Sequence, residues 1–523
     1  MVVKGLLILI YLFFTVSDVL NIMILEKNNS SRTSCLYPVI LAFWRIIVSK
    51  FGEVLREYIS KNGYSINEFA GKCKIDRAWL SNVLSGRKEL SEAKFDNILK
   101  SKLLSESQNE NLIALYRLKD FSSDQVERME YIMEHLSRKI RRNDSIAPIE
   151  YDENRRMYFG KANLLSVLYR IIENKDELSF IYTNIPTEAE ESLDVLYDFL
   201  KHDDYKKIDY KHIFLTDNGV SIHNISTYFT ICDFAELGYT DFSVIKDVEL
   251  NSLNTNDFFP YFILTDKKIM LFDAEFNNAI VSFDDKIINV HTRKFMALYE
   301  KGENPVTSFS NAVDLMRTLT SMHNSSSELS FTPDFCVTPC LDYDILNKNA
   351  APNLPDKELL IRAVLNHYNI DYSHFSNFVT IESINRFAKD GIIYEIPRDY
   401  LLPVDVESRI KLLKYVKDNI DNNGKYKTYI LNPTKFNYNS YDIQVEKIGV
   451  LTVCGIRQGN KDNIQSFMGE WLCSIDDENI FKDFMNLEKY LIESKTVYSD
   501  EFSSQYVSNI ILELSAQHSK GEM

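Results

Sequence analysis

The sequence predicts a multidomain protein in which an all-α domain near the N-terminus is followed by mixed α/β (α+β) domains. With 523 residues, the chain exceeds what one hydrophobic core usually supports. Short, capped helical patterns follow one another over residues 48–104, and strand-like and helix-like stretches alternate beyond Pro148. The composition, 45% hydrophobic and 26% charged, is typical of folded domains. We expect an apolar leader at 1–47, a helical domain at 48–104, a helical connector at 105–147, and sensor-like α/β domains at 148–345 and 346–523.

The leader contains one apolar run long enough to cross a bilayer, the 21 residues from Gly5 to Leu25. A second run, Leu36–Val48, is shorter and is interrupted by Arg45. Three interpretations stay open: a membrane anchor, a buried helical hairpin, or translated sequence upstream of the true start. We favour the last, because the helical domain begins immediately at Val48. The seven cysteines have no regular spacing, which favours reduced thiols and a cytoplasmic protein; the alternative is a protein anchored in the membrane through residues 5–25.

The first two helices of the helical domain follow from apolar spacing and from cap residues. Apolar residues recur at helical spacing over Phe51–Ile59 and predict a helix that ends near Asn62-Gly63. Ser65 is a good N-cap for a second helix, and Glu68 three residues later completes a capping box.

The third and fourth helices are predicted by the same logic. Asp76 caps a helix over Arg77–Leu84, which Ser85-Gly86 terminates. Ser91 then caps a fourth helix. Helices this short are not stable alone in water, so we expect them to pack on one another.

The segment from Ser65 to Lys88, SINEFAGKCKIDRAWLSNVLSGRK, resembles the helix-turn-helix of the Cro/phage-repressor family, also known as the XRE or lambda repressor-like family. Ala70 matches the family's small residue where two helices cross closely, and Gly86-Arg87-Lys88 matches its basic turn after the third helix. The family's core positions are matched by Ile75, Leu80 and Val83. Two positions depart: Lys74 stands where the family prefers glycine, and Leu84 replaces a frequent glutamate. A positive φ at Lys74 would carry a backbone cost.

The resemblance implies that the third helix enters the major groove of DNA. By position, the base-contacting residues would be Arg77, Ala78, Trp79 and Asn82, and the phosphate-contacting residues would be Ser65, Asn67, Arg87 and Lys88. Arg77 would pair with guanine, Asn82 with adenine, and Ala78 would touch a thymine methyl group. For Trp79 two interpretations stay open: stacking against a sugar or methyl group, and folding back onto the domain.

The net charge of −16 is compatible with DNA binding because it is unevenly distributed. Residues 48–104 contain 11 Lys+Arg and 7 Asp+Glu, a balance of +4, which leaves 48 and 68, or −20, for the remainder. Affinity for nucleic acid depends on a local basic face, because counterions are released where the phosphates are contacted.

The connector is predicted to continue as helix from a Ser105 cap. Its apolar residues step by three and four, as in a short coiled coil; they are Val126, Met129, Met133, Leu136 and Ile140. This seam predicts a homodimer that reads two half-sites, and packing on a neighbouring domain is the alternative. The basic run Arg138–Arg142 would either touch flanking phosphates or form a solvated helix end.

The C-terminal region is predicted to be mixed α/β. Strands are expected at 178–183, 212–216, 227–232, 261–265, 269–272, 280–283, 378–382, 428–431, 443–445, 450–454 and 471–475, and helices at 161–174, 187–201, 292–299, 404–419, 479–494 and 501–515. One internal echo suggests a duplication: Ser282-Phe283-Asp284-Asp285 recurs as Ser474-Ile475-Asp476-Asp477, each followed by a Phe-Met pair. The approach to a strand at Tyr205–Leu215 would then correspond to Lys425–Leu431. Chance similarity is the alternative, and a common strand order would decide.

No catalytic or cofactor motif is found, so we expect no enzyme, no catalytic residues and no cofactor. Cys336 and Cys340 form a lone C-x3-C pair, so no metal site is expected. The sequence thus predicts a sequence-specific DNA-binding transcriptional regulator whose C-terminal region senses an unidentified small-molecule or protein effector. The alternative is a protein-interaction or membrane-anchored regulatory protein that uses the helix-turn-helix domain for docking.

Overall fold

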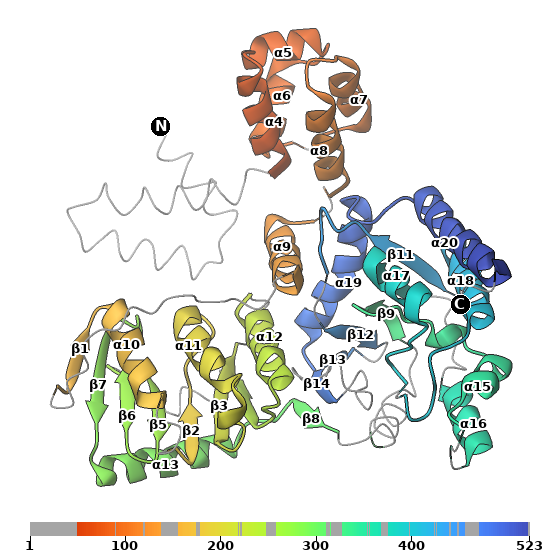
Figure 1. Cartoon of the computed structure of the whole chain (residues 1–523). Helices are drawn as coiled ribbons and strands as arrows, with labels where there is room; N and C mark the ends of the chain where they lie inside the picture. Colours follow the sequence, from red (N-terminus) through yellow and green to blue (C-terminus); the bar gives the residue numbers. More distant parts are fainter. Residues whose placement is uncertain are drawn as a thin grey trace, which may run out of the picture. The chain divides into compact units, whose positions relative to one another are not determined.

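A computed structural model of the chain describes residues 50–520 with gaps, the longest of which are 138–154, 247–257, 315–326 and 456–469. The apolar runs at 5–25 and 36–48 lie outside the described residues. Among the residues that are described, no helix is both long and apolar enough to cross a membrane. The chain divides into two compact units, Met1–Asp124 and Gln125–Met523, and is a multidomain α/β protein with its all-α part first (Figure 1).

The first unit is a bundle of short helices. They are α4 (Lys50–Lys61), α5 (Ile66–Lys72), α6 (Arg77–Leu84), α7 (Glu92–Lys100) and α8 (Glu106–Arg117). The bounds of α6 are those predicted from the sequence. Leu55, Phe69 and Leu80 are fully buried in one shared core, which supplies the stability that such short helices lack alone.

Cap residues set where these helices begin. Ser65 forms the predicted capping box, in which its hydroxyl accepts from the Glu68 amide at 3.2 Å and the Glu68 carboxylate accepts from the Ser65 amide at 2.9 Å. Ser105 forms a second capping box, with Gln108. Ser91 precedes α7 as predicted, but its side chain makes no capping hydrogen bond.

Helices α4 and α6 approach each other most closely at Gly52. A Cβ atom at this position would lie 2.9 Å from the carbonyl oxygens of both Val83 and Leu84. The Leu84 carbonyl also accepts a hydrogen bond from the Arg56 guanidinium at 3.3 Å, a favourable place for a cation at a helix C-terminus. Glycine at position 52 therefore lets α4 hold the C-terminal end of α6.

The predicted connector helix is interrupted, because α8 ends at Arg117 and a new helix, α9 (Ser123–Ser137), follows. The apolar seam of α9 is covered within the second unit, where Arg128 Nε donates to Asp483 Oδ2 at 2.7 Å and the His135 ring stacks on Phe229 at 4.4 Å. Packing on a neighbouring domain, the alternative interpretation of this seam, therefore holds. Ile140 and the basic run 138–142 lie outside the described residues.

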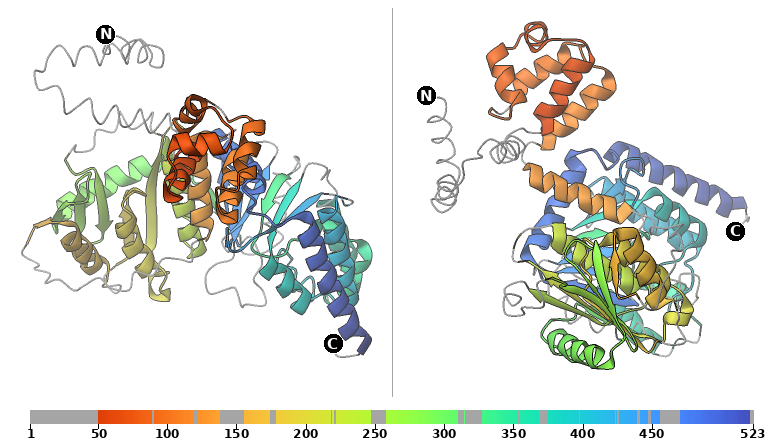
Figure 2. Two further views of the ribbon diagram at one scale, coloured as in Figure 1. Left: turned by 90° about the horizontal axis from the view of Figure 1, so that it is seen from above. Right: turned by 90° about the vertical axis from the view of Figure 1, so that its left-hand side faces the viewer.

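The second unit contains two seven-stranded mixed sheets. The first sheet is built from β1 (Met157–Phe159), β2 (Phe180–Thr183), β3 (Asp209–Thr216), β4 (Phe242–Lys246), β5 (Tyr261–Thr265), β6 (Ile269–Phe272) and β7 (Asn278–Ser282). Its helices are α10 (Lys161–Ile172), α11 (Glu190–Leu200), α12 (Ile222–Glu236) and α13 (Asp285–Tyr299). Helix α13 covers one face of this sheet, and α10, α11 and α12 cover the other (Figures 1 and 2).

The second sheet contains β8 (Val306–Ser308), β9 (Ser327–Phe331), β10 (Ser376–Thr380), β11 (Lys427–Leu431), β12 (Asp442–Glu446), β13 (Leu451–Gly455) and β14 (Trp471–Ile475). Its larger helices are α15 (Tyr343–Asn349), α16 (Lys357–His367), α17 (Ile381–Asp390), α18 (Val406–Ile420), α19 (Glu478–Glu493) and α20 (Asp500–Lys520). The boundary predicted at residue 345 is therefore placed too late, since β8 and β9 already belong to this second sheet.

The two sheets have the same topology. Their orders are β4-β3-β2-β5-β6-β7-β1 and β11-β10-β9-β12-β13-β14-β8, so each strand of the first sheet corresponds to the strand seven places later. The senses agree as well: β2, β3 and β4 are parallel, as are β9, β10 and β11, and every other neighbouring pair is antiparallel. Asp284 and Asp477 cap the corresponding helices α13 and α19. The strand order thus supports the predicted duplication.

Two details of the sequence prediction are wrong. Lys425–Leu431 overlaps β11, which corresponds to β4 and not to the strand that follows Tyr205. The segment Thr227–Cys232, predicted as a strand, lies inside α12. This helix is buried on most sides because it packs against β3 of the first sheet and against β13 and β14 of the second.

Candidate nucleic-acid interface

Helix α6 is fixed at both ends by hydrogen bonds from its own segment. The Asp76 carboxylate accepts from the Trp79 amide at 2.7 Å and caps the N-terminus. At the other end Gly86 has φ +70°, and the amides of Gly86 and Arg87 donate to the carbonyls of Val83 and Asn82 at 3.0 and 2.8 Å. This closure is the glycine-terminated type that the sequence predicts.

The burial pattern of α6 separates an inner and an outer side. Leu80, Val83 and Leu84 are buried in the bundle core. Arg77, Ala78 and Ser81 are exposed, and Asn82 is half-buried. Three of the four predicted base-contacting residues therefore keep an accessible side chain.

Trp79 is the exception. Its ring is 7% exposed, belongs to the core cluster, and has Lys94 Nζ 3.9 Å from its centroid. Of the two interpretations left open, folding back onto the domain is the one that the structure adopts, so Trp79 does not present its ring to a base. This orientation is favourable because the ring packs against apolar side chains of the core and also contacts the Lys94 ammonium group.

Ser81 was missed by the sequence reasoning. It follows Arg77 by four residues, so both residues lie on the same face of α6. The spacing alone could have identified it, because i and i+4 positions of a helix are neighbours.

The predicted phosphate-contacting residues are all exposed; they are Ser65, Asn67, Arg87 and Lys88. Within the described part of the chain, neither Arg87 nor Lys88 forms an ion pair, and the same holds for Arg77. No carboxylate of a described residue therefore pairs with these three charges. The Ser65 hydroxyl, in contrast, is engaged by Glu68. Hydrogen bonds from the Ser65 amide and from the Ser65 hydroxyl to the Glu68 carboxylate lower the pKa of that carboxyl.

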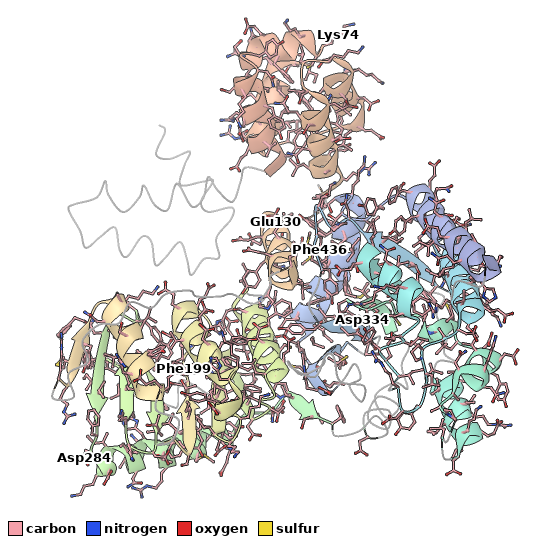
Figure 3. The ribbon with its side chains drawn as sticks, in the orientation of Figure 1. Lys74, Glu130, Phe199, Asp284, Asp334 and Phe436 are labelled. Atoms are coloured by element: carbon pink, nitrogen blue, oxygen red, sulfur yellow. The ribbon has the colours of Figure 1, made fainter. Side chains whose placement is uncertain are left out.

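The turn before α6 adds another cation. Lys74 is exposed (Figure 3) and has φ +56°. This is the positive φ considered in the sequence analysis, where Lys74 occupies a position at which the family prefers glycine. The turn thus keeps a lysine at some conformational cost, on the same short segment as Arg77.

No group of three or more metal-ligating side chains is found among the described residues. Cys336 and Cys340, the lone C-x3-C pair, are not joined to each other by a disulfide; Cys340 Sγ lies 3.4 Å from the Tyr426 hydroxyl.

Compared with known proteins, the chain matches no protein family and no curated protein. Among solved structures, it is similar to TrmBL2, an archaeal chromatin protein described with a novel mode of DNA binding, at 14% identity and a TM-score of 0.21 over 35% of this chain. The chain spans 64% of the length of TrmBL2. It is also similar to a phosphatidylserine synthase from Haemophilus influenzae Rd KW20, at 10% identity and a TM-score of 0.22, over 70% of this chain and 93% of that one.

Likenesses this weak carry no argument about the activity of the present chain. The second neighbour is an enzyme, which contradicts the sequence-based expectation that enzymes are excluded, and that exclusion is withdrawn.

Proposed function

We propose that the chain is a sequence-specific DNA-binding transcriptional regulator whose first unit reads DNA through α6 and whose second unit senses an effector. The observation that carries this proposal is the outer side of α6, where Arg77, Ala78 and Ser81 are exposed on a helix capped at both ends. A helix with short outward side chains and an unpaired arginine suits a major groove.

The resemblance of Ser65–Lys88 to the Cro/phage-repressor family supports the same use of the helix. We assign base contacts to Arg77, Ala78, Ser81 and Asn82, and phosphate contacts to Asn67, Arg87 and Lys88, with Ser65 contributing through the N-terminus of α5. The exposed cations of this segment supply the local positive face that an acidic protein needs for DNA.

The proposal is tested by selecting bound DNA from a random pool with the whole chain, with and without cell extract. Arg77→Ala is expected to relax the preference at one base pair by about 1–3 kcal/mol, because one bidentate contact is lost. Lys88→Ala is expected to weaken binding to all sequences alike and to reduce the salt slope by about one.

The matched control is Lys100→Ala, which removes the same charge from α7, where Lys100 pairs with Asp96 at 3.1 Å. It is expected to leave both the selected sequence and the salt slope unchanged. An Arg77→Ala variant that selects the same motif as the parent would refute the register. Binding without salt dependence would favour a protein-docking role, and the spacing of selected half-sites reports whether two copies bind together.

A further inference from the structure

The second unit contains a cavity of about 380 Å³ where β2 and β3 end. Its walls come from the loop after β2, the end of β3, the start of α12 and the start of β5. β2 has the parallel strand β3 on one side and the antiparallel strand β5 on the other, so the chain order reverses at β2. In open α/β sheets the carboxyl ends of the strands at such a reversal are where ligands bind.

Two threonines that line the cavity have buried hydroxyl groups for which the described residues provide no hydrogen-bond partner. Thr187 is 4% exposed and Thr227 is fully buried, and neither Oγ1 atom has a partner within the described residues. A buried hydroxyl without a partner costs about 1–3 kcal/mol relative to an apolar group of the same shape. A ligand that hydrogen-bonded both hydroxyls would remove this cost.

Within the cavity wall, the charges of His223 and Glu188 compensate each other, and Asp217 adds a further carboxylate. His223, on α12, donates from Nε2 to the Leu215 carbonyl at 2.7 Å and pairs through Nδ1 with Glu188. The hydrogen bond between them raises the pKa of His223 and lowers the pKa of Glu188, which favours the imidazolium–carboxylate form of the pair. With Asp217 also in the wall, the cavity has no surplus positive charge and does not favour an anion.

The corresponding edge of the second sheet carries an analogous pair. Arg386, on α17 after β10, pairs with Asp334. Asp334, labelled in Figure 3, follows β9. His223 and Glu188 occupy the same places after β3 and β2. The two halves thus share a polar carboxyl edge, although different residues form it.

We propose that this cavity binds a small uncharged molecule that carries hydroxyl groups, of about monosaccharide size. The volume lies at the lower end of the range for small-molecule sites. Thr187 and Thr227 would hydrogen-bond the ligand hydroxyls, and the neutralised His223–Glu188 pair would discriminate against phosphorylated forms. The role of the ligand as an effector rests on the proposed DNA-binding function, whereas its binding does not.

The test measures the unfolding temperature of the whole chain, followed by tryptophan fluorescence, against a panel of uncharged monosaccharides and polyols and against their phosphate esters. At least one uncharged compound is expected to raise the unfolding temperature in a saturable manner. Thr227→Val and Thr187→Val are expected to weaken this response at least tenfold while keeping or raising the unfolding temperature without ligand.

Thr428→Val is the matched control, because Thr428 on β11 also has a buried hydroxyl without a partner among the described residues but is not part of the cavity wall. It is expected to keep the full response. No response to any uncharged compound, a response only to phosphate esters, or an unchanged response in both cavity variants would overturn the proposal. DNA selection in the presence of a compound that saturates the thermal response is a separate experiment. A chain that binds the compound but no DNA would refute the proposed regulator function and would leave the proposed ligand site unaffected.

Discussion

Substitution of Gly52 by alanine tests the packing that orients the proposed DNA-reading helix. The added Cβ would lie 2.9 Å from two carbonyl oxygens of α6, those of Val83 and Leu84. Backbone atoms cannot rotate away as a side chain can, so α4 and α6 must separate. Inserting one methyl group into a closed contact of this kind costs about 1–3 kcal/mol.

Gly71→Ala provides the reference, because Gly71 also lies in a helix, α5, and a Cβ atom added there would have no neighbouring atom within 4 Å among the described residues. Both variants gain the same helix propensity, about 1 kcal/mol, when glycine becomes alanine. The difference between their free energies of unfolding therefore isolates the clash and is expected to be about 1–3 kcal/mol. Urea unfolding followed by tryptophan fluorescence, to which the buried Trp79 of the first unit contributes, measures it. Equal stability of the two variants would refute the close approach of α4 to α6.

Three further changes test other features. Lys74→Gly is expected to stabilise the first unit by about 1 kcal/mol in urea unfolding, since φ is +56° there, and to weaken DNA binding; a loss of stability would contradict the strained turn. Burial raises the pKa of Glu395 to about 7, so the stability that its neutral form contributes is complete below pH 4.5 and is lost as the pH rises through 7. The second unit is therefore expected to be less stable at pH 8 than at pH 6. Glu395→Gln is expected to raise its free energy of unfolding at pH 8 by about 3 kcal/mol, because glutamine stays uncharged. If variant and parent show the same dependence of stability on pH, this carboxyl is not the cause. Arg128→Ala leaves the carboxylate of Asp483, which is 3% exposed, without its ion-pair partner and is expected to cost about 3 kcal/mol. The cost is measured by urea unfolding followed by tryptophan fluorescence, to which Trp471 of the second unit contributes. An unfolding midpoint equal to that of the parent would show that α9 does not depend on this pair.

Local signals made the first unit predictable. The bounds of α6 follow from Asp76 before it and Gly86 after it, and both act through hydrogen bonds that span only three to five residues. The same locality explains the correct capping box at Ser65. Trp79 could not be placed in this way, because its orientation depends on Lys94 from the next helix.

The second unit depends on contacts that are distant in sequence. The aromatic and β-branched run Thr227–Cys232 favours a strand locally, but burial between two sheets allows a helix that is apolar around most of its surface. Strand order was not predictable, since β2 pairs with β5 across more than one intervening helix. The cavity was also missed, because Thr187 and Thr227 are brought together only by the packing of α12 on the first sheet.

Helix α12 makes the two sheets mechanically dependent on each other. The helix contributes His223 and Thr227 to the cavity at the first sheet, and it also packs against β13 and β14 of the second sheet. Helices transmit a displacement along and across their axis with little deformation, since close-packed interiors are poorly compressible. A molecule that shifts α12 on entering the first half is therefore expected to alter the packing of this helix on β13 and β14 as well, which couples the two duplicated halves.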